Sequence, residues 1–265
     1  MCGIVGYIGH RDAYPIIIKG LQRLEYRGYD SAGVALFDGN DIQLAKTKGK
    51  VEDLKKKSEA TISLQGKLGI GHTRWATHGE PNDVNSHPHY SNSGELVIIH
   101  NGIIENYREL KKELASAGHE FKSDTDTEVI AHAIEERQKQ HSKESLLDST
   151  RAVLKTVKGT FGLAILSRRE PDTIVVAKNG SPLLIGVGAG KDEFFAASDA
   201  SAILHHTDRV VYLEDGEIAQ ITPKDFSVHT IDGSRQKIER DPETIDWSPE
   251  SIQKQGFDHF LLKEI

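Results

Sequence analysis

Short apolar runs, each bounded by turn-forming residues, recur along most of the chain and limit the folds open to it. Runs of roughly four to eight apolar residues have the length of strands rather than of helices. Asp-Gly pairs beginning at Asp38, Asp215 and Asp232 fall between such runs, and this dipeptide favours tight hairpins and hence antiparallel pairing. The predicted strands span residues 3–9, 32–37, 67–73, 95–101, 160–167, 173–178, 183–187, 209–213 and 217–221.

Helical patterns lie between some of the predicted strands. Residues 12–24 carry apolar side chains at helical spacing, and residues 104–117 form a second pattern that Gly118 closes. A third helix is predicted to open at Thr125, because Thr125 and Glu128 match the Thr-x-x-Glu capping box. Helices combined with hairpin-connected strands predict the α+β class, an antiparallel sheet with covering helices.

The charge balance argues against a polyanionic partner. The chain has 33 Lys and Arg against 40 Asp and Glu, a net charge of -7, so we expect no nucleic acid and no anionic membrane as partner. The N-terminus lacks the basic and apolar regions of a signal peptide, and no stretch approaches the roughly 20 apolar residues of a membrane span. We therefore expect a cytoplasmic protein.

The chain has one cysteine, and its position is informative. A single thiol excludes an internal disulfide and argues against a thiolate zinc site. Cys2 follows Met1 and precedes Gly3, and a small second residue permits removal of the methionine. The freed α-amine, with a pKa of about 7.7 to 8.0, would then act as base for the thiol of the same residue. The alternative is that a small residue follows Met1 by chance.

The Asn101-Gly102 pair follows a run that we predict to be a buried strand. The ordinary interpretation is a type I′ hairpin turn. The helical pattern that follows instead places the pair at a strand end leading into a helix. There the Asn101 amide and the Gly102 backbone N–H can converge on an oxyanion. Both interpretations remain open on these residues alone.

Residues 74–93 form a long stretch without apolar periodicity, and such loops are usually functional or disordered. We expect a substrate lid. The Arg74 guanidinium at its start is suited to a substrate carboxylate, although arginines are also common on surfaces. Trp75, one of only two tryptophans, suits a gate better than a core position in this polar context.

Asp126 is predicted in the first turn of the helix that opens at Thr125. An acid is favoured there by the helix dipole whether or not it binds a ligand. The same carboxylate could receive the α-ammonium of an amino acid. With Arg74 on the α-carboxylate, the pair would then recognise a zwitterion.

Two further patterns predict neither a metal nor a cofactor. His87-Pro88-His89 resembles half of a metal site, but no matching carboxylate or cysteine cluster accompanies it, so metal binding is a weak alternative. Gly186, Gly188 and Gly190 do not follow the G-x-G-x-x-G spacing of a dinucleotide loop. They indicate a turn between strands.

Five segments in order give the chain a specific family resemblance. Together they are similar to the glutaminase domain of glutamine-fructose-6-phosphate aminotransferase, within the class II glutamine amidotransferases, and the resemblance covers residues 2–241. The segments are CGIVGYIG from Cys2, LEYRGYDSAG from Leu24, HTRWATHGEPNDVNSHPH from His72, HNGIIENY from His100 and SDTDTEVIAH from Ser123.

The resemblance implies a four-layer αββα N-terminal-nucleophile hydrolase fold with two antiparallel sheets. It implies that Cys2 attacks the side-chain amide of L-glutamine to give a thioester and ammonia, and that water then releases L-glutamate. Asn101 and Gly102 would form the oxyanion hole.

The same resemblance assigns substrate contacts, each carried over from a matching position. The α-carboxylate would be held by Arg74, Thr77 and His78, and the α-ammonium by Asp126 with Gly102. Trp75 would belong to the loop that closes over glutamine. Arg27 would brace the nucleophile, and His87 would support the site.

The resemblance also divides the chain. Residues 2–240 are expected to be the glutaminase domain, and residues 241–265 a linker and the start of a helix. The two sugar-phosphate isomerase domains expected next are absent, so the chain would be a fragment or a stand-alone glutaminase, and the full-length enzyme a homodimer. The alternatives are the glutaminase domain of another amidotransferase, such as that making phosphoribosylamine, or a non-catalytic glutamine-sensing module.

Overall fold

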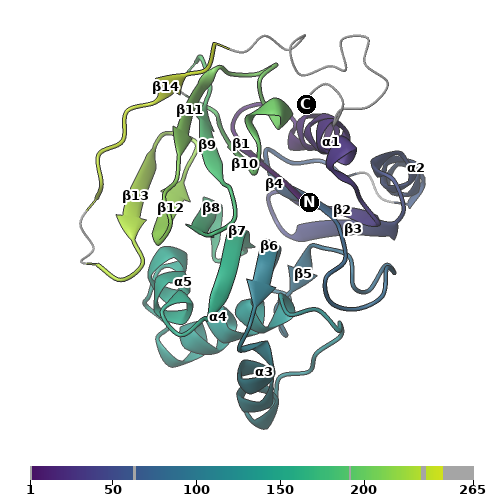
Figure 1. The fold of residues 1–265 in the computed structure, drawn as a ribbon, viewed down its shortest axis with the longest axis vertical. Coiled ribbons are helices and arrows are strands. Elements are labelled where there is room, and N and C mark those ends of the chain that lie inside the picture. Colours follow the sequence, from purple (N-terminus) through teal and green to yellow (C-terminus); the bar gives the residue numbers. More distant parts are fainter. Residues whose placement is uncertain (1, 62–63, 191, 234–236, 247–265) are drawn as a thin grey trace, which may run out of the picture.

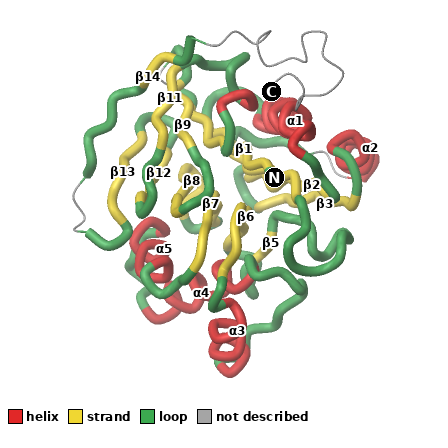
Figure 2. The backbone as a smooth tube through the Cα atoms, viewed as in Figure 1, coloured by secondary structure: helices red, strands yellow, loops and turns green. Residues whose placement is uncertain are grey.

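The computed structural model describes residues 2–61, 64–190, 192–233 and 237–246. Two antiparallel sheets lie face to face, and helices cover the outer face of each (Figure 1). Figure 2 shows the same arrangement by element type, with strands in the middle and helices on both outsides. Within the described ranges, no helix combines the length and apolar character needed to cross a membrane.

The first sheet has Cys2 directly before one of its central strands. The strand order is β14-β11-β9-β10-β1-β4-β2-β3, and the register aligns Gly3 of β1 with Thr73 of β4. The strands are β1 (Gly3–Ile8), β2 (Ser31–Phe37), β3 (Ile42–Lys48), β4 (Leu68–Arg74), β9 (Leu184–Val187), β10 (Phe194–Ala197), β11 (Arg209–Tyr212) and β14 (Glu243–Thr244).

The second sheet has the order β13-β12-β8-β7-β6-β5. Its longest pairing joins β6 to β7 from Leu96 opposite Ser167 to Ile104 opposite Gly159. The strands are β5 (His89–Tyr90), β6 (Leu96–Ile104), β7 (Gly159–Ser167), β8 (Glu170–Asn179), β12 (Glu217–Ile221) and β13 (Phe226–Thr230).

Burial on both faces explains why the strands are continuous apolar runs. In β1, Ile4 and Ile8 join the core between the sheets, whereas Val5 and Tyr7 join the core under the helices. The first sheet is covered by α1 (Ala13–Leu24) and α2 (Val51–Thr61), and the second by α3 (Tyr107–Ser116), α4 (Glu128–Gln140) and α5 (Leu146–Leu154). The predicted α+β class and the four αββα layers are confirmed.

The helix predicted over residues 12–24 is confirmed, because the Asp12 side chain accepts from the Tyr14 N–H and begins α1. The hairpin predicted at Asp38 is confirmed by the pairing of β2 with β3. The strand β3 itself was not predicted. It is an edge strand in which only Ile42 and Ala45 are buried, so it lacks a continuous apolar run.

The hairpin predicted at Asp215 is wrong. The chain passes there from β11 in the first sheet to β12 in the second, and Gly216 bonds to the Lys178 carbonyl. At Asp232 the chain does turn back, because Val228 and Ile238 form an antiparallel bridge. The turn predicted among the glycines at 186–190 is also present, since the Gly188 N–H closes the connection by bonding to the Glu193 carbonyl.

The capping box predicted at Thr125 is wrong. Helix α4 begins at Glu128, and Thr127 makes no side-chain capping bond. The Glu128 carboxylate instead accepts hydrogen bonds from the backbone and hydroxyl of Ser123 and from the Lys122 N–H. The second predicted helix also begins later than expected, because β6 continues to Ile104 and α3 starts at Tyr107.

The predicted linker begins with ordered structure, since Glu243 and Thr244 in β14 pair with β11. The helix predicted towards residue 265 lies outside the described residues.

Candidate active site

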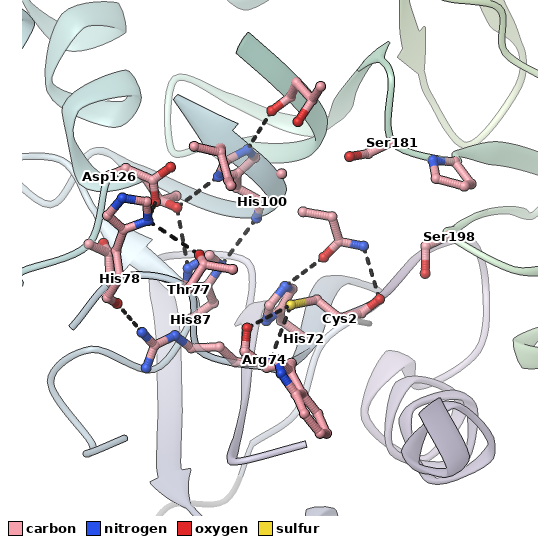
Figure 3. Close-up of a pocket in the computed structure, with 18 of the residues that line it drawn as sticks. Cys2, His72, Arg74, Thr77, His78, His87, His100, Asp126, Ser181 and Ser198 are labelled. Atoms are coloured by element: carbon pink, nitrogen blue, oxygen red, sulfur yellow. Dashed lines mark hydrogen bonds and ion pairs between the residues drawn. The ribbon is translucent and has the colours of Figure 1, made fainter. Parts of the chain in front are cut away.

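A cavity of about 420 Å³ opens where the start of β1, the end of β4 and the middle of β6 meet (Figure 3). All ten residues that the sequence singled out line it, although they come from distant parts of the chain. The lining residues are Cys2, Arg27, His72, Arg74, Trp75, Thr77, His78, His87, His100, Asn101, Gly102, Ile103, Thr125, Asp126, Thr127, Thr160, Ser181, Pro182 and Ser198.

Cys2 lies directly before β1, and its sulfur contacts the backbone of Trp75. The Trp75 N–H donates to Sγ across 3.1 Å, and Sγ lies 3.5 Å from the Trp75 carbonyl. Burial raises the pKa of the Cys2 thiol, and the hydrogen bond with Trp75 opposes that rise. The resting group is therefore a thiol, and it needs a base before it can act as a nucleophile.

Asn101 places its side-chain amide beside the nucleophile. Its Nδ2 donates to the Cys2 carbonyl across 3.1 Å, and its Oδ1 lies 2.9 Å from His72 Nε2. Asn101 pairs with Gly162 inside the β6–β7 ladder, so both the predicted strand end and the alternative hairpin turn are wrong here. The amide reaches the cavity because β6 runs past Cys2 at this point.

Gly102 has a φ of 132°, in the region that favours glycine. A Cβ at this position would lie 2.1 Å from the Thr160 carbonyl oxygen on β7. Close packing against β7 therefore requires glycine here independently of any role in chemistry.

The Arg74 guanidinium is buried and already engaged by the protein. It donates to the backbone carbonyls of His78 and, across 3.0 Å, Gly79, and it lies 3.7 Å from Asp30. These contacts hold the first part of the loop after β4. This anchoring role was not foreseen from the sequence, which suggested only a contact with a ligand carboxylate.

Asp126 lies before α4 and not in its first turn, where the sequence had predicted it. One carboxylate oxygen accepts the Ile104 N–H across 2.7 Å, and the other lies 4.0 Å from His78 Nδ1. The His78 ring meets Tyr107 edge-on and lies 3.3 Å from the exposed Thr77 hydroxyl. An anionic and an imidazole side chain thus face each other on one cavity wall.

Trp75 and Arg27 line the same cavity as the nucleophile. The Trp75 side chain is 55% exposed, and its ring packs over Gly28, where a Cβ would lie 2.0 Å from the ring. Arg27 lies 3.5 Å from Asp199, which follows β10. Arg27 therefore ties the segment after α1 to the end of a strand that flanks β1.

The loop between β4 and β5 has an exposed first part and a buried second part. Residues 75–80 are exposed or half-buried, whereas residues 85–89 are buried. Lys46 of β3 bonds to the carbonyls of Val84 and Pro88 and holds the second part. Only the first part has the exposure that the predicted lid requires.

Three buried histidines, His72, His87 and His100, line the cavity, and of these the sequence pointed only to His87 as a supporting residue. His87 Nδ1 accepts the His100 N–H, and Thr127 links His87 to His100 through its hydroxyl. His87 and His89 meet edge-on at 4.7 Å, and His89 Nε2 bonds to Thr125. No group of three or more His, Cys, Asp or Glu arranged to hold a metal occurs among the described residues.

Comparison with known proteins assigns the chain to a family. The family profile described as glutamine amidotransferase domain matches residues 72–205. The chain belongs to this family of glutamine amidotransferase domains.

Curated relatives agree with the resemblance seen in the sequence. The chain is 51% identical to the glutamine–fructose-6-phosphate aminotransferase (isomerizing) of Chlorobaculum tepidum, covering 100% of this chain and 43% of that protein. It is 49% identical to the enzyme of the same name from Thermococcus kodakarensis, covering 100% of this chain and 43% of that protein. The chain thus spans less than half the length of these relatives.

Solved structures show the same fold. Glutamine phosphoribosylpyrophosphate amidotransferase from B. subtilis superposes with a TM-score of 0.74 and 29% identity over 89% of this chain and 50% of that chain. A structure described as the allosteric regulatory enzyme of purine biosynthesis gives a TM-score of 0.75 at 29% identity, over 88% of this chain and 50% of that one.

Proposed function

We propose that this domain hydrolyses L-glutamine to L-glutamate and ammonia, with Cys2 as the nucleophile. The observation that carries the proposal is the contact between the Asn101 side-chain amide and Cys2 at the cavity wall. One hydrogen of Nδ2 is donated to the Cys2 carbonyl. The second can therefore be donated to the oxyanion that forms on the glutamine carboxamide when the Cys2 sulfur attacks it.

The chemistry begins with removal of Met1, which frees the α-amine of Cys2. That amine takes the thiol proton, and sulfur attacks the carboxamide carbon of glutamine. The carbonyl electrons move onto oxygen, and the Asn101 amide with the Gly102 N–H stabilises the resulting oxyanion. When the C–N bond breaks, the ammonium returns its proton to the leaving nitrogen, which departs as ammonia and leaves a thioester.

Hydrolysis of the thioester completes the cycle. The α-amine takes a proton from water as the oxygen attacks the thioester carbon, and the sulfur leaves and regains its proton. Arg74, Thr77 and His78 are proposed to bind the α-carboxylate, and Asp126 the α-ammonium. For Arg74 this requires sharing the guanidinium between the ligand and the loop carbonyls that it holds.

We further propose that the ammonia serves a longer enzyme that aminates fructose 6-phosphate through sugar-phosphate isomerase domains. The support is the 51% identity to an aminotransferase of that name, against 29% identity to the phosphoribosylpyrophosphate amidotransferase. An acceptor assay with the full-length protein distinguishes the two: amino-sugar formation supports the proposal, and phosphoribosylamine formation contradicts it.

The hydrolytic step is tested with purified protein in which intact mass shows that Met1 has been removed. Glutamate and ammonia should appear in equal amounts, and Cys2→Ala should release neither while keeping its folded circular dichroism spectrum. An electrophilic glutamine analogue should add its mass to the wild type and not to Cys2→Ala. Glutamine binding without turnover or adduct would instead support the sensing-module alternative.

A further inference from the structure

His72 is a buried residue of β4 that contacts the proposed oxyanion donor. Its Nε2 lies 2.9 Å from Asn101 Oδ1, whereas the Nδ2 of the same amide donates to the Cys2 carbonyl. The side chain is 0% exposed, so water does not compete for this contact.

The partners of the Asn101 amide fix its orientation. The Cys2 carbonyl can only accept a hydrogen bond, so the amide must turn its NH₂ end towards Cys2. Its Oδ1 therefore faces His72, and because that oxygen can only accept, His72 Nε2 must carry the proton. Burial lowers the pKa of His72 to about 3, so the ring is neutral and has one N–H to donate.

The His72 ring is itself held in place. It stacks on His87 with ring centroids 4.3 Å apart and planes inclined by 25°. The backbone of His72 pairs with Ile4 on one side and Gly33 on the other, in the middle of the first sheet. The donor is thus fixed by backbone pairing and by ring packing before any ligand arrives.

We infer that His72 is a positioning residue, which fixes the Asn101 amide so that its NH₂ group faces the oxyanion formed at Cys2. The inference rests on the proposed glutaminase function. Without the His72 N–H, the buried Oδ1 would lose its donor, and an unsatisfied buried acceptor is unfavourable. The Asn101 amide would then rotate towards other donors, and its NH₂ group would no longer point at the oxyanion.

The test replaces His72 in three ways. His72→Leu removes the donor, His72→Phe removes it but keeps an aromatic ring against His87, and His72→Gln supplies a side-chain N–H in its place. His119→Leu is the matched control, because His119 is also buried but bonds to Glu136 outside the cavity. Each folded variant is assayed for glutamate release and for inhibition by two ligands.

The two ligands separate positioning from general damage. The aldehyde analogue of glutamine accepts the Cys2 thiol at its carbonyl carbon, and the thiol proton neutralises the new oxygen, which occupies the oxyanion position. L-Glutamate binds in the same cavity without forming that adduct. His72→Leu and His72→Phe should lower kcat by about 10-fold to 10³-fold and weaken aldehyde binding in parallel. KM and glutamate inhibition should change by less than about two-fold.

His72→Gln should recover most of the rate, and His119→Leu should match the wild type. In an Asn101→Ala background, His72→Phe should cause little further loss of kcat, because the amide that His72 positions is gone.

Wild-type kcat in either donor-lacking variant contradicts the inference, and so does an equal weakening of aldehyde binding and glutamate binding. If Leu and Phe both prevent folding, a His72→Gln variant that folds but loses kcat as Asn101→Ala does also contradicts it, whereas one with near-wild-type kcat supports it. Absence of turnover in the wild type after Met1 removal would instead refute the glutaminase proposal.

Discussion

Trp75 donates its backbone N–H to the Cys2 sulfur across 3.1 Å, so the nucleophile is tied to the first residue of the loop that follows β4. Arg74, the preceding residue, binds the carbonyls of His78 and Gly79 in the same loop. The position of the thiol and the conformation of the loop are therefore coupled. A change that shifts the loop should alter the chemistry as well as the affinity for glutamine.

Gly28→Ala should disturb this coupling. Gly28 has a φ of 92°, and a Cβ there would lie 2.0 Å from the Trp75 ring. We expect the ring to be displaced, kcat/KM for glutamine to fall at least about 10-fold, and the protein to lose about 1–2 kcal/mol of stability. Glutamate release and urea unfolding measure the two effects.

Gly94→Ala is the control for backbone strain. Gly94 also has a positive φ, 81°, but a Cβ there would meet nothing within 4 Å. Gly94→Ala should therefore lose a similar amount of stability, while its kcat/KM for glutamine stays unchanged. If Gly28→Ala behaves in the same way, Trp75 does not depend on Gly28 for its position.

Asn101→Ala should lower kcat by about 10² to 10³-fold and leave KM nearly unchanged, because the amide acts on charge that develops in the transition state. Asn106→Ala removes a half-buried asparagine that bonds to Thr156 and Lys158 outside the cavity, and it should match the wild type kinetically. A raised KM with wild-type kcat would make Asn101 a binding residue instead.

Asp126→Asn should separate charge from structure. An asparagine oxygen can still accept the Ile104 N–H, so the fold should be retained while the charge proposed to bind the α-ammonium is lost. We expect KM to rise by at least about 10-fold with little loss of stability, and Asp126→Ala to lose stability as well. Wild-type KM in a folded Asp126→Asn protein would contradict the assigned contact.

The sequence predicted most of the first and second sheets because strands buried on both faces leave continuous apolar runs. It missed β3 and β13, edge strands with only one or two buried residues each, the two-residue strands β5 and β14, and β10, which is buried but only four residues long. The Asp-Gly pair at Asp215 was misread because its local turn chemistry does not reveal that the next strand joins the other sheet. Local dipeptides report backbone conformation, not the partner of the strand that follows.

The residues that the sequence assigned to the site line one cavity, but the contacts among them were not predicted. Asn101 was expected at a strand end, whereas long-range pairing with β7 carries the strand past it. His72 and His100 stood inside quoted motifs without an assigned contact. Their partners are Asn101 and Thr127, which lie 29 and 27 residues away. Hydrogen bonds between separate strands and loops leave no periodic signal in the sequence.

The buried histidines should make stability depend on pH on the acid side of neutrality. Burial holds the pKa of His72 at about 3 and the pKa of His87 well below its ordinary value. The unfolded chain protonates these groups near pH 6.5, whereas the folded protein does not. Stability from this source is therefore complete above about pH 6.5, and it is lost progressively as the pH falls towards the folded pKa values.

Each histidine that stays neutral in the fold should contribute a slope of up to about 1.4 kcal/mol per pH unit below that point. Glu128 and Glu135 add a second loss at lower pH. Burial opposes these low pKa values, but hydrogen bonds from His132 to Glu128 and from Ser91 and Ser93 to Glu135 hold both pKa values at about 2.

We expect the free energy of unfolding in urea to be flat from pH 8 to 7 and to fall steeply from pH 6 to 5. Burial also lowers the pKa of His89. His89→Gln removes this imidazole, so the slope should fall by the contribution of about one proton, about 1.4 kcal/mol per pH unit. A free energy of unfolding that stays constant down to pH 5 would show that these rings take up protons in the folded state.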